Sequence, residues 1–164
     1  MRVFERKYIL KNKPGKIQPF ETIYIEQAWL SFDNDVRIRK ETRPYKTKGF
    51  IDSYYMIMKS DKISDSYDQK LIEISYGVYN ELLKNAEGTK VEKLRKRYNY
   101  NGYILDIDDY KSIPDLKLIE VEFDNINDYD KFNPLADWFG VEVSQNDAYK
   151  NINLAKYDGV YKLK

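Results

Sequence analysis

The sequence predicts an α+β protein built around an antiparallel β-sheet, either closed as a barrel or packed as a sandwich, with a few helices beside it. Eight segments alternate apolar and polar residues, which is the pattern of a strand with one face toward a core. The dipeptide Asn101-Gly102 lies between two apolar and aromatic runs and is a strong hairpin signal. Only three short segments favour helix, so β-structure dominates the prediction.

The predicted strands are separated by turn signals such as Lys13-Pro14-Gly15 and Asp33-Asn34. We expect strands at residues 3–10, 22–30, 36–40, 54–60, 69–75, 91–98, 103–107 and 117–123. The spacing of Val78, Leu82 and Leu83 predicts a helix over residues 76–86 that ends before Gly88. A short helix capped by Asn127-Asp128 and ended by Pro134, and a third helix over residues 148–157, complete the expected elements.

The composition excludes several kinds of chemistry, because the 164 residues include no histidine and no cysteine. A Ser-His-Asp triad, a thiol nucleophile, a disulfide framework and a cysteine zinc site are all ruled out. Any catalysis must use carboxylates, Lys, Arg, Tyr or hydroxyl groups, together with a hard cation such as Mg²⁺. A P-loop is excluded too, since no Gly-x-x-x-x-Gly-Lys-Ser/Thr motif occurs.

Length and charge predict one domain over residues 1–164, with a net charge of +1. No repeat or linker divides the chain, the first ten residues do not resemble a secretory signal, and no apolar run approaches the roughly 20 residues of a membrane span. We therefore expect a cytoplasmic protein without a membrane partner. The basic run at residues 90–97 is better explained as one face of a strand than as a patch for duplex nucleic acid.

Nearly every predicted strand has one apolar face and one face of full charges. The charged faces carry Glu5 and Lys7, Arg37 and Arg39, Lys59, Lys93, Arg95 and Arg97, Asp106, and Glu120 and Glu122. An ordinary amphipathic sheet with a solvated face is one explanation. The other is a closed sheet with the charges inside, where a ligand and metal must balance them. Polyphosphate with Mg²⁺ or Mn²⁺ would do so, because Lys and Arg bind its oxygens while carboxylates bind the metal.

A series of short blocks, in order and spacing, resembles the CYTH superfamily, the triphosphate tunnel metalloenzymes. The resemblance covers nearly the whole chain and is carried by residues 4–10 (FERKYIL), 26–30 (EQAWL), 36–39 (VRIR), 55–59 (YMIMK), 91–95 (VEKLR), 105–106 (LD), 118–123 (LIEVEF), 138–143 (WFGVEV), 149–151 (YKN) and 154–155 (LA). It implies a closed eight-stranded antiparallel tunnel that holds a triphosphate along its axis. Homodimers are common in this family.

The resemblance also implies a role for each charged residue. The family's phosphate-binding positions correspond to Lys7, Arg37, Arg39, Lys59, Lys93 and Arg95. Its metal-binding positions correspond to Glu5, Glu120 and Glu122, with Asp106 beside them, and the implied cofactor is Mg²⁺ or Mn²⁺. We expect Lys7, Arg39 and Glu122 to be the catalytic residues among these, and Asp108 to lie at the surface.

The chain departs from the family pattern mainly at carboxylates. Val3 stands where the first strand usually has a glutamate, and Ala148 stands where an arginine is common. Tyr67, Gln69 and Leu71 take the positions of an arginine and two glutamates, with Glu73 two residues further along. A register slip of two residues would return Glu73 to the tunnel. The cationic half of the motif is therefore complete, whereas the metal-binding half is reduced.

Three functions are compatible with these residues. The leading hypothesis is metal-dependent hydrolysis of inorganic triphosphate or of a nucleoside triphosphate. The alternative is a module that binds and sequesters a nucleotide or cyclic oligonucleotide without turnover, which the missing carboxylates at Val3 and Leu71 favour. A class IV-type adenylate cyclase, which converts ATP to cyclic AMP, would use the same cations and differs in its product.

Overall fold

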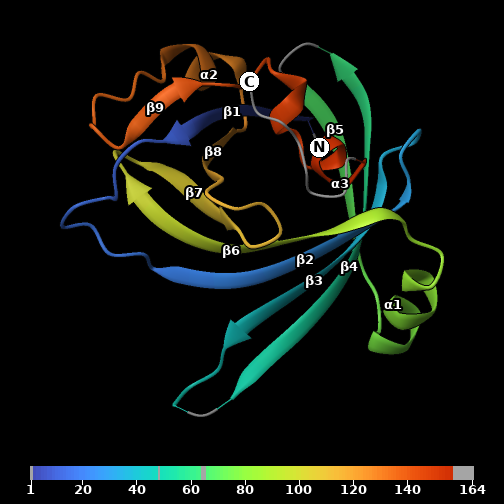
Figure 1. The fold of residues 1–164 in the computed structure, drawn as a ribbon. Coiled ribbons are helices and arrows are strands. Elements are labelled where there is room, and N and C mark those ends of the chain that lie inside the picture. Colours follow the sequence, from blue (N-terminus) through green and yellow to red (C-terminus); the bar gives the residue numbers. More distant parts are fainter. Residues whose placement is uncertain (1, 48, 64–65, 157–164) are drawn as a thin grey trace.

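The protein, seen in a computed structural model, is described over residues 2–47, 49–63 and 66–156, and this part of the chain is mostly β-structure (Figure 1). Its strands are β1 (Arg2–Leu10), β2 (Glu21–Ser31), β3 (Val36–Pro44), β4 (Phe50–Ile63), β5 (Ser66–Glu73), β6 (Glu87–Tyr100), β7 (Tyr103–Tyr110), β8 (Lys117–Phe123) and β9 (Phe139–Glu142). Its helices are α1 (Tyr76–Leu83), α2 (Ile126–Lys131), the 3₁₀-helix η1 (Asp147–Tyr149) and α3 (Asn151–Lys156).

Eight strands close into an antiparallel barrel in the order β5-β4-β3-β2-β6-β7-β8-β1, because β5 pairs with β1 as well as with β4. Among the described residues the seam between β1 and β5 is short, with pairs at Arg2, Val3 and Phe4. Further along, β1 leaves β5 and pairs with β9, which lies outside the ring. The closed eight-stranded barrel expected from the sequence is confirmed, and β9 is an addition.

The hairpin between β6 and β7 turns at the predicted dipeptide. Asn101 and Gly102 have φ angles of 50° and 85°, and Tyr100 pairs with Tyr103 across the turn. Two successive residues with positive φ are the requirement of a type I′ turn, which Asn-Gly meets at low cost. The local sequence therefore sets the register of this strand pair.

The strand prediction is confirmed for all eight expected segments, with one notable shift in boundaries. The fifth strand covers Ser66–Glu73 instead of residues 69–75, because Ser75 caps α1. The Ser75 hydroxyl accepts a hydrogen bond from the backbone N–H of Val78 at 3.2 Å, as a helix N-cap does. The expected first helix is thus present, and it begins where the strand was predicted to continue.

The other two helices also differ in detail from the prediction. Asn125, two residues before the expected cap, accepts a 2.9 Å hydrogen bond from the backbone N–H of Asp128 and begins α2. The last predicted helix is divided into η1 and α3, and Tyr157 lies outside the described residues. None of the described helices is both long and apolar enough to cross a membrane.

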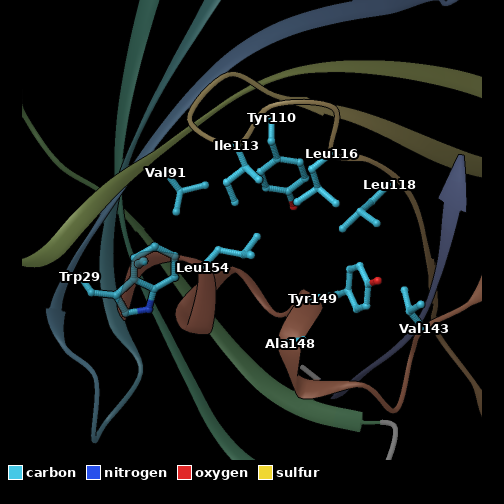
Figure 2. Packing of buried hydrophobic residues seen from close by; sticks show 11 residues of the cluster. Trp29, Val91, Tyr110, Ile113, Leu116, Leu118, Val143, Ala148, Tyr149 and Leu154 are labelled. Atoms are coloured by element: carbon cyan, nitrogen blue, oxygen red, sulfur yellow. The ribbon is translucent and has the colours of Figure 1, made fainter. Parts of the chain in front are cut away.

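One end of the barrel is closed by an apolar cluster to which η1 and α3 contribute (Figure 2). Trp29, Leu118 and Leu154 are completely buried in it. Burial of such large apolar side chains is the main favourable contribution to the stability of a fold. The cluster therefore fixes the C-terminal helix against the strand ends. A second cluster, which includes the buried Trp138, packs on the outside of β1, β7 and β8.

Candidate active site

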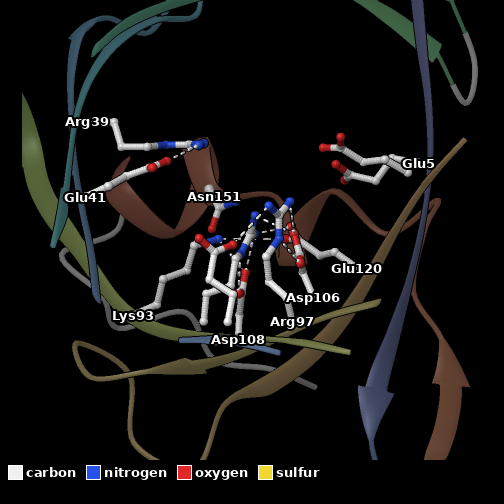
Figure 3. Close-up of polar contacts among 12 residues, drawn as sticks. Glu5, Arg39, Glu41, Lys93, Arg97, Asp106, Asp108, Glu120 and Asn151 are labelled. Atoms are coloured by element: carbon white, nitrogen blue, oxygen red, sulfur yellow. Dashed lines mark hydrogen bonds and ion pairs between the residues drawn. The ribbon is translucent and has the colours of Figure 1, made fainter. Parts of the chain in front are cut away.

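The charged faces of the strands point into the barrel, whose interior we call the lumen. Figure 3 shows side chains from opposite walls directed toward one another across it. Lys93 and Asp108 are 1% and 0% exposed in their side chains, a level that a solvated outer face would not give. Strand pairing places Arg37 and Arg39 on one wall and Glu120 on another. Of the two explanations left open by the sequence, the charged lumen is the one observed.

Arg95 is the centre of an ion-pair cluster on the β6–β8 wall. Its guanidinium contacts Asp106 at 2.8 Å, Asp108 at 2.7 Å and Glu120 at 2.7 Å. Burial opposes the charge of Arg95, but these three carboxylates outweigh it and hold the pKa of Arg95 well above its usual value. Arg95 and Asp106, predicted as phosphate and metal ligands, are therefore engaged with each other in this state.

Asp108 corrects one expectation, because it is completely buried and not at the surface. It accepts hydrogen bonds from Arg95 Nε and Nη2 and from Lys93 Nζ. Burial raises its pKa, but the charges of Arg95 and Lys93 outweigh burial and lower it. The strand alternation that places Asp106 in the lumen applies equally to Asp108, and this was the signal available in the sequence.

Lys7 lies between two of the predicted metal ligands. Its Nζ is 3.1 Å from Glu120 Oε1 and 3.4 Å from Glu5 Oε1. Burial disfavours its charge, yet Glu120 and Glu5 together raise the pKa of Lys7. Burial likewise raises the pKa of Glu120, but the charges of Lys7 and Lys93 above all outweigh burial. They hold this pKa well below its usual range. Both groups are charged at neutral pH.

Glu5 and Glu122 are direct partners in the β1–β8 pairing and form a carboxylate pair bridged by Tyr67. The Tyr67 hydroxyl lies 3.3 Å from Glu5 Oε2 and 3.5 Å from Glu122 Oε1. Glu122 has no ion-pair partner among residues 2–47, 49–63 and 66–156. Enclosure by the barrel wall and the nearby charge of Glu5 raise the pKa of Glu122, although its side chain is partly accessible to solvent.

The register of β5 places Tyr67 and Gln69 toward the lumen. Gln69 pairs with Lys59, and Glu73 pairs with Tyr55 and is exposed. The slip that would bring Glu73 into the tunnel does not occur, so Glu73 stays outside the charged cluster. Tyr67 instead contributes its ring, which lies 3.9 Å from the ammonium of Lys59 in a cation–π contact.

Arg37, Arg39 and Lys59 form a cationic wall on β3 and β4. Arg37 contacts Asp35 at 3.2 Å and stacks over Trp29 at 5.0 Å, while Arg39 contacts Glu41 at 3.2 Å. Among the described residues Lys59 forms no ion pair. Burial and the charge of Arg37 lower the pKa of Lys59 to about 7. This wall has more positive charge than its acidic neighbours balance, which is the condition for binding an anion.

A cavity of about 100 Å³ lies between this wall, β1 and the C-terminal helix. Its cations are Lys7, Arg37, Lys59 and Lys150, and its carboxylates are Glu5 and Asp35. The remaining lining consists of Ser66, Tyr67, Ser144, Asn151 and Ile152. The cavity joins predicted phosphate and metal ligands that are far apart in the chain. The other predicted site residues are not part of this lining and lie on other parts of the lumen wall; they are Arg39, Lys93, Arg95, Asp106, Glu120 and Glu122.

A divalent cation has a limited choice of ligands here. No three acidic side chains of the described chain are grouped so that they could hold a metal ion. Glu5 and Glu122 are adjacent, however, and Glu122 forms no ion pair within the part of the chain that the structure describes. Mg²⁺ is commonly bound by one or two carboxylates, several waters and the phosphates of its substrate. The Glu5–Glu122 pair fits such a site, whereas Asp106 and Glu120 are held by Arg95.

Comparison with known proteins gives a consistent result. The chain is similar to an inorganic triphosphatase of Acetivibrio thermocellus, with 29% identity over 154 residues that cover 93% of this chain and 92% of the relative. An inorganic triphosphatase of Nitrosomonas europaea is 29% identical over 158 residues, 94% of this chain and 97% of the relative. The crystal structure of the inorganic triphosphatase NE1496 matches with a TM-score of 0.62 and 26% identity over 93% of each chain. Over nearly its whole length the chain is thus similar to CYTH-like inorganic triphosphatases. No protein-family model matches it.

Two lumen residues of this CYTH-like protein were not singled out from the sequence. Asp35, with a φ of 47°, accepts hydrogen bonds from Trp29 Nε1 and holds Arg37. Gln27 is completely buried beside Arg39. Gln27 shares strand parity with Trp29 and could have been placed by alternation, whereas the contacts of Asp35 depend on the turn between β2 and β3.

Proposed function

We propose that the lumen binds inorganic triphosphate and that the protein hydrolyses it to diphosphate and phosphate. The observation that carries this proposal is the cationic wall of Arg37, Arg39 and Lys59, which retains uncompensated positive charge and unpaired N–H donors. The names of the two relatives, both inorganic triphosphatases, favour inorganic triphosphate over a nucleoside triphosphate.

The proposed chemistry depends on charge placement. Arg37, Arg39 and Lys59 bind the phosphate chain, and Lys7, held charged by Glu120 and Glu5, stabilises the charge that develops on the leaving diphosphate. Preorganised cations in an enclosed site need little reorganisation during the reaction, which is why they lower its barrier. Lys93 and Arg95 act indirectly by fixing Glu120 and Asp108.

Glu122 is the carboxylate best able to orient the attacking water. Tyr67 contacts one of its oxygens at the edge of hydrogen-bond distance, so most of its acceptor capacity stays available. Glu5 and Glu122 are also the residues that would hold Mg²⁺ or Mn²⁺. When bound there, the cation would neutralise phosphate oxygens and act as a Lewis acid.

The test is one incubation of purified protein with tripolyphosphate, ATP and GTP, each with and without Mn²⁺, followed by product analysis. We expect phosphate and diphosphate from tripolyphosphate in the presence of metal, and slower or no reaction with the nucleotides. Absence of phosphate release from tripolyphosphate under every condition would reject hydrolysis. Cyclic AMP as the product of ATP would assign the cyclase alternative instead.

Binding without turnover is the second candidate, and the engagement of Asp106 and Glu120 by Arg95 favours it. With those two carboxylates neutralised, only Glu5 and Glu122 remain for a metal. In that case a nucleotide or cyclic oligonucleotide would bind tightly in EDTA and elute unchanged on chromatography. Release of phosphate above a metal-free blank would reject this candidate.

A further inference from the structure

Gln27 is a completely buried amide among the lumen cations. It lies on β2, opposite Arg39 of β3, and its Oε1 accepts a hydrogen bond from Arg39 Nη2 at 3.3 Å. Its Nε2 has no hydrogen-bond partner in the described structure. Buried amide N–H groups are nearly always paired in proteins, so an unpaired one requires an explanation.

The orientation of this amide follows from its neighbour. A guanidinium has only donors, so the Gln27 oxygen must face Arg39 and the NH₂ group must face away from it. Exchanging the two amide atoms would bring two donors together and leave the oxygen unpaired. The unpaired atom of Gln27 is therefore a donor.

Two further donors on the same wall share this property. The Nε–H groups of Arg37 and Arg39 are buried and also lack partners in this part of the structure. Arg37, Arg39 and Gln27 come from two adjacent strands, and strand pairing directs all three side chains to the same side of the sheet. Three N–H donors without an acceptor match a ligand whose oxygens only accept, such as an ionised phosphoryl group.

We propose that Gln27 is a phosphoryl-binding residue whose Nε2 donates to an oxygen of the anion held by Arg37 and Arg39. This inference rests on the proposed function and assigns part of its binding site to a neutral side chain. Because the amide adds no charge, it contributes directional hydrogen bonding to a wall whose other donors are charged guanidinium and ammonium groups. Its other role is to position Arg39 through Oε1.

The test measures the affinity of three variants for tripolyphosphate by calorimetric titration in EDTA, so that neither metal nor turnover enters the result. Gln27→Leu removes both roles, whereas Gln27→Glu keeps an acceptor for Arg39 and removes the donor. Gln18→Leu, at an exposed glutamine outside the barrel, is the matched control. Thermal unfolding of each variant with and without tripolyphosphate shows whether it is folded.

We expect both Gln27 variants to bind tripolyphosphate roughly 10- to 100-fold more weakly, the effect of losing one hydrogen bond to a charged group, and Gln18→Leu to match the wild type. If Gln27→Glu binds as well as the wild type, Gln27 acts only by holding Arg39 and the inference is overturned. Unchanged binding by Gln27→Leu overturns it as well. If the wild type itself does not bind tripolyphosphate, the proposed function fails and the inference with it.

Discussion

Arg95 and Asp108 lie directly opposite each other in the β6–β7 pairing and are joined by two hydrogen bonds of 2.7 Å, with Asp108 completely buried. Lys93 Nζ contacts the same carboxylate at 2.5 Å. The positive charges of Lys93 and Arg95 are thus both balanced by the carboxylate of Asp108, which is buried away from water. A buried ion pair adds little net stability by itself, but removal of one partner leaves an uncompensated buried charge.

Asp108→Ala should therefore lower the free energy of unfolding by about 3–5 kcal/mol, measured by urea denaturation. The adjacent Asp109 is a matched control, because it is about one-third exposed and contacts Lys111 and Lys117 at 3.2 and 3.7 Å. Asp109→Ala should change the free energy of unfolding by less than about 1 kcal/mol, as surface ion pairs do. Equal effects of the two substitutions would contradict the role given to Asp108.

Arg39→Ala should reduce turnover of tripolyphosphate at least about 100-fold, the scale for loss of one electrostatic stabiliser. The substitution removes a cation and its unpaired Nε–H from the lumen wall. Arg2→Ala is the control, since the Arg2 side chain contacts Ser66 and Asp68 and none of the charged residues that we place in the site. Near-normal steady-state rates in Arg39→Ala would remove Arg39 from the site.

Glu122→Ala should also reduce turnover about 100-fold, but without weakening the binding of tripolyphosphate in EDTA. Glu122 is close to Glu5 and has no cation partner, so its removal lowers negative charge near the anion. Kinetics and metal-free calorimetry on the same preparation separate the two effects. A parallel loss of metal-free affinity and turnover would mean that Glu122 supports the anion site and not the chemistry.

The affinity for tripolyphosphate should fall as pH rises above about 7, because Lys59 then loses its proton. The groups that face Lys59 and act on its charge, besides burial, are Arg37, Glu5, Glu122 and Lys7. A bound polyanion favours charged Lys59 and raises its pKa, so binding takes up a proton above pH 7. One proton allows at most about a tenfold loss of affinity per pH unit.

Lys59→Arg supplies the control for this pH dependence, because arginine stays charged throughout the range. Titration of the ligand itself cancels when the two proteins are compared at each pH. The ratio of wild-type Kd to Lys59→Arg Kd should rise between about pH 7 and about pH 9 and be constant below about pH 6. A constant ratio over the whole range would show that Lys59 is charged in the free protein.

Gly88→Ala should destabilise the closed end of the barrel. Gly88 has a φ of 64°, and an added Cβ would lie 2.6 Å from the backbone oxygen of Ala155 and 2.7 Å from Phe32 Cζ. Both the conformation and the contact are unfavourable, so we expect a loss of about 1–3 kcal/mol in urea denaturation. Gly15→Ala, with open space around it, should change stability by less than about 1 kcal/mol.

The sequence was sufficient to predict the eight barrel strands, because each is long enough to show alternation. It was not sufficient for β9, which has four residues and includes Gly140. A Cβ at Gly140 would lie 2.8 Å from the backbone oxygen of Ile9, so this glycine meets a requirement of packing between distant segments. Such a contact leaves no periodic pattern in the local sequence.

Alternation also predicted most of the charged residues that share the lumen, although Asp108 was wrongly placed at the surface, and it did not predict which of them pair. Asp106 and Asp108 have the same parity, and only the register of β7 against β6 places Asp108 between Lys93 and Arg95. The bridging of Glu5 and Glu122 by Tyr67 likewise depends on the seam between β1 and β5. Most residues of the site could therefore be predicted from the sequence, whereas the ion pairs by which they neutralise one another could not.

The position of β1 has a consequence for how the protein is made. This strand is synthesised first, yet its hydrogen-bond partners are β5, β8 and β9, which follow it by many residues. During translation the start of β1 can pair with β5 early, but the rest of β1 lacks its partners until residues 117–123 and 139–142 have left the ribosome. A nascent chain that ends before β8 has neither a closed ring nor Glu120 and Glu122, so the charged cluster of the lumen stays incomplete until β8 has been synthesised.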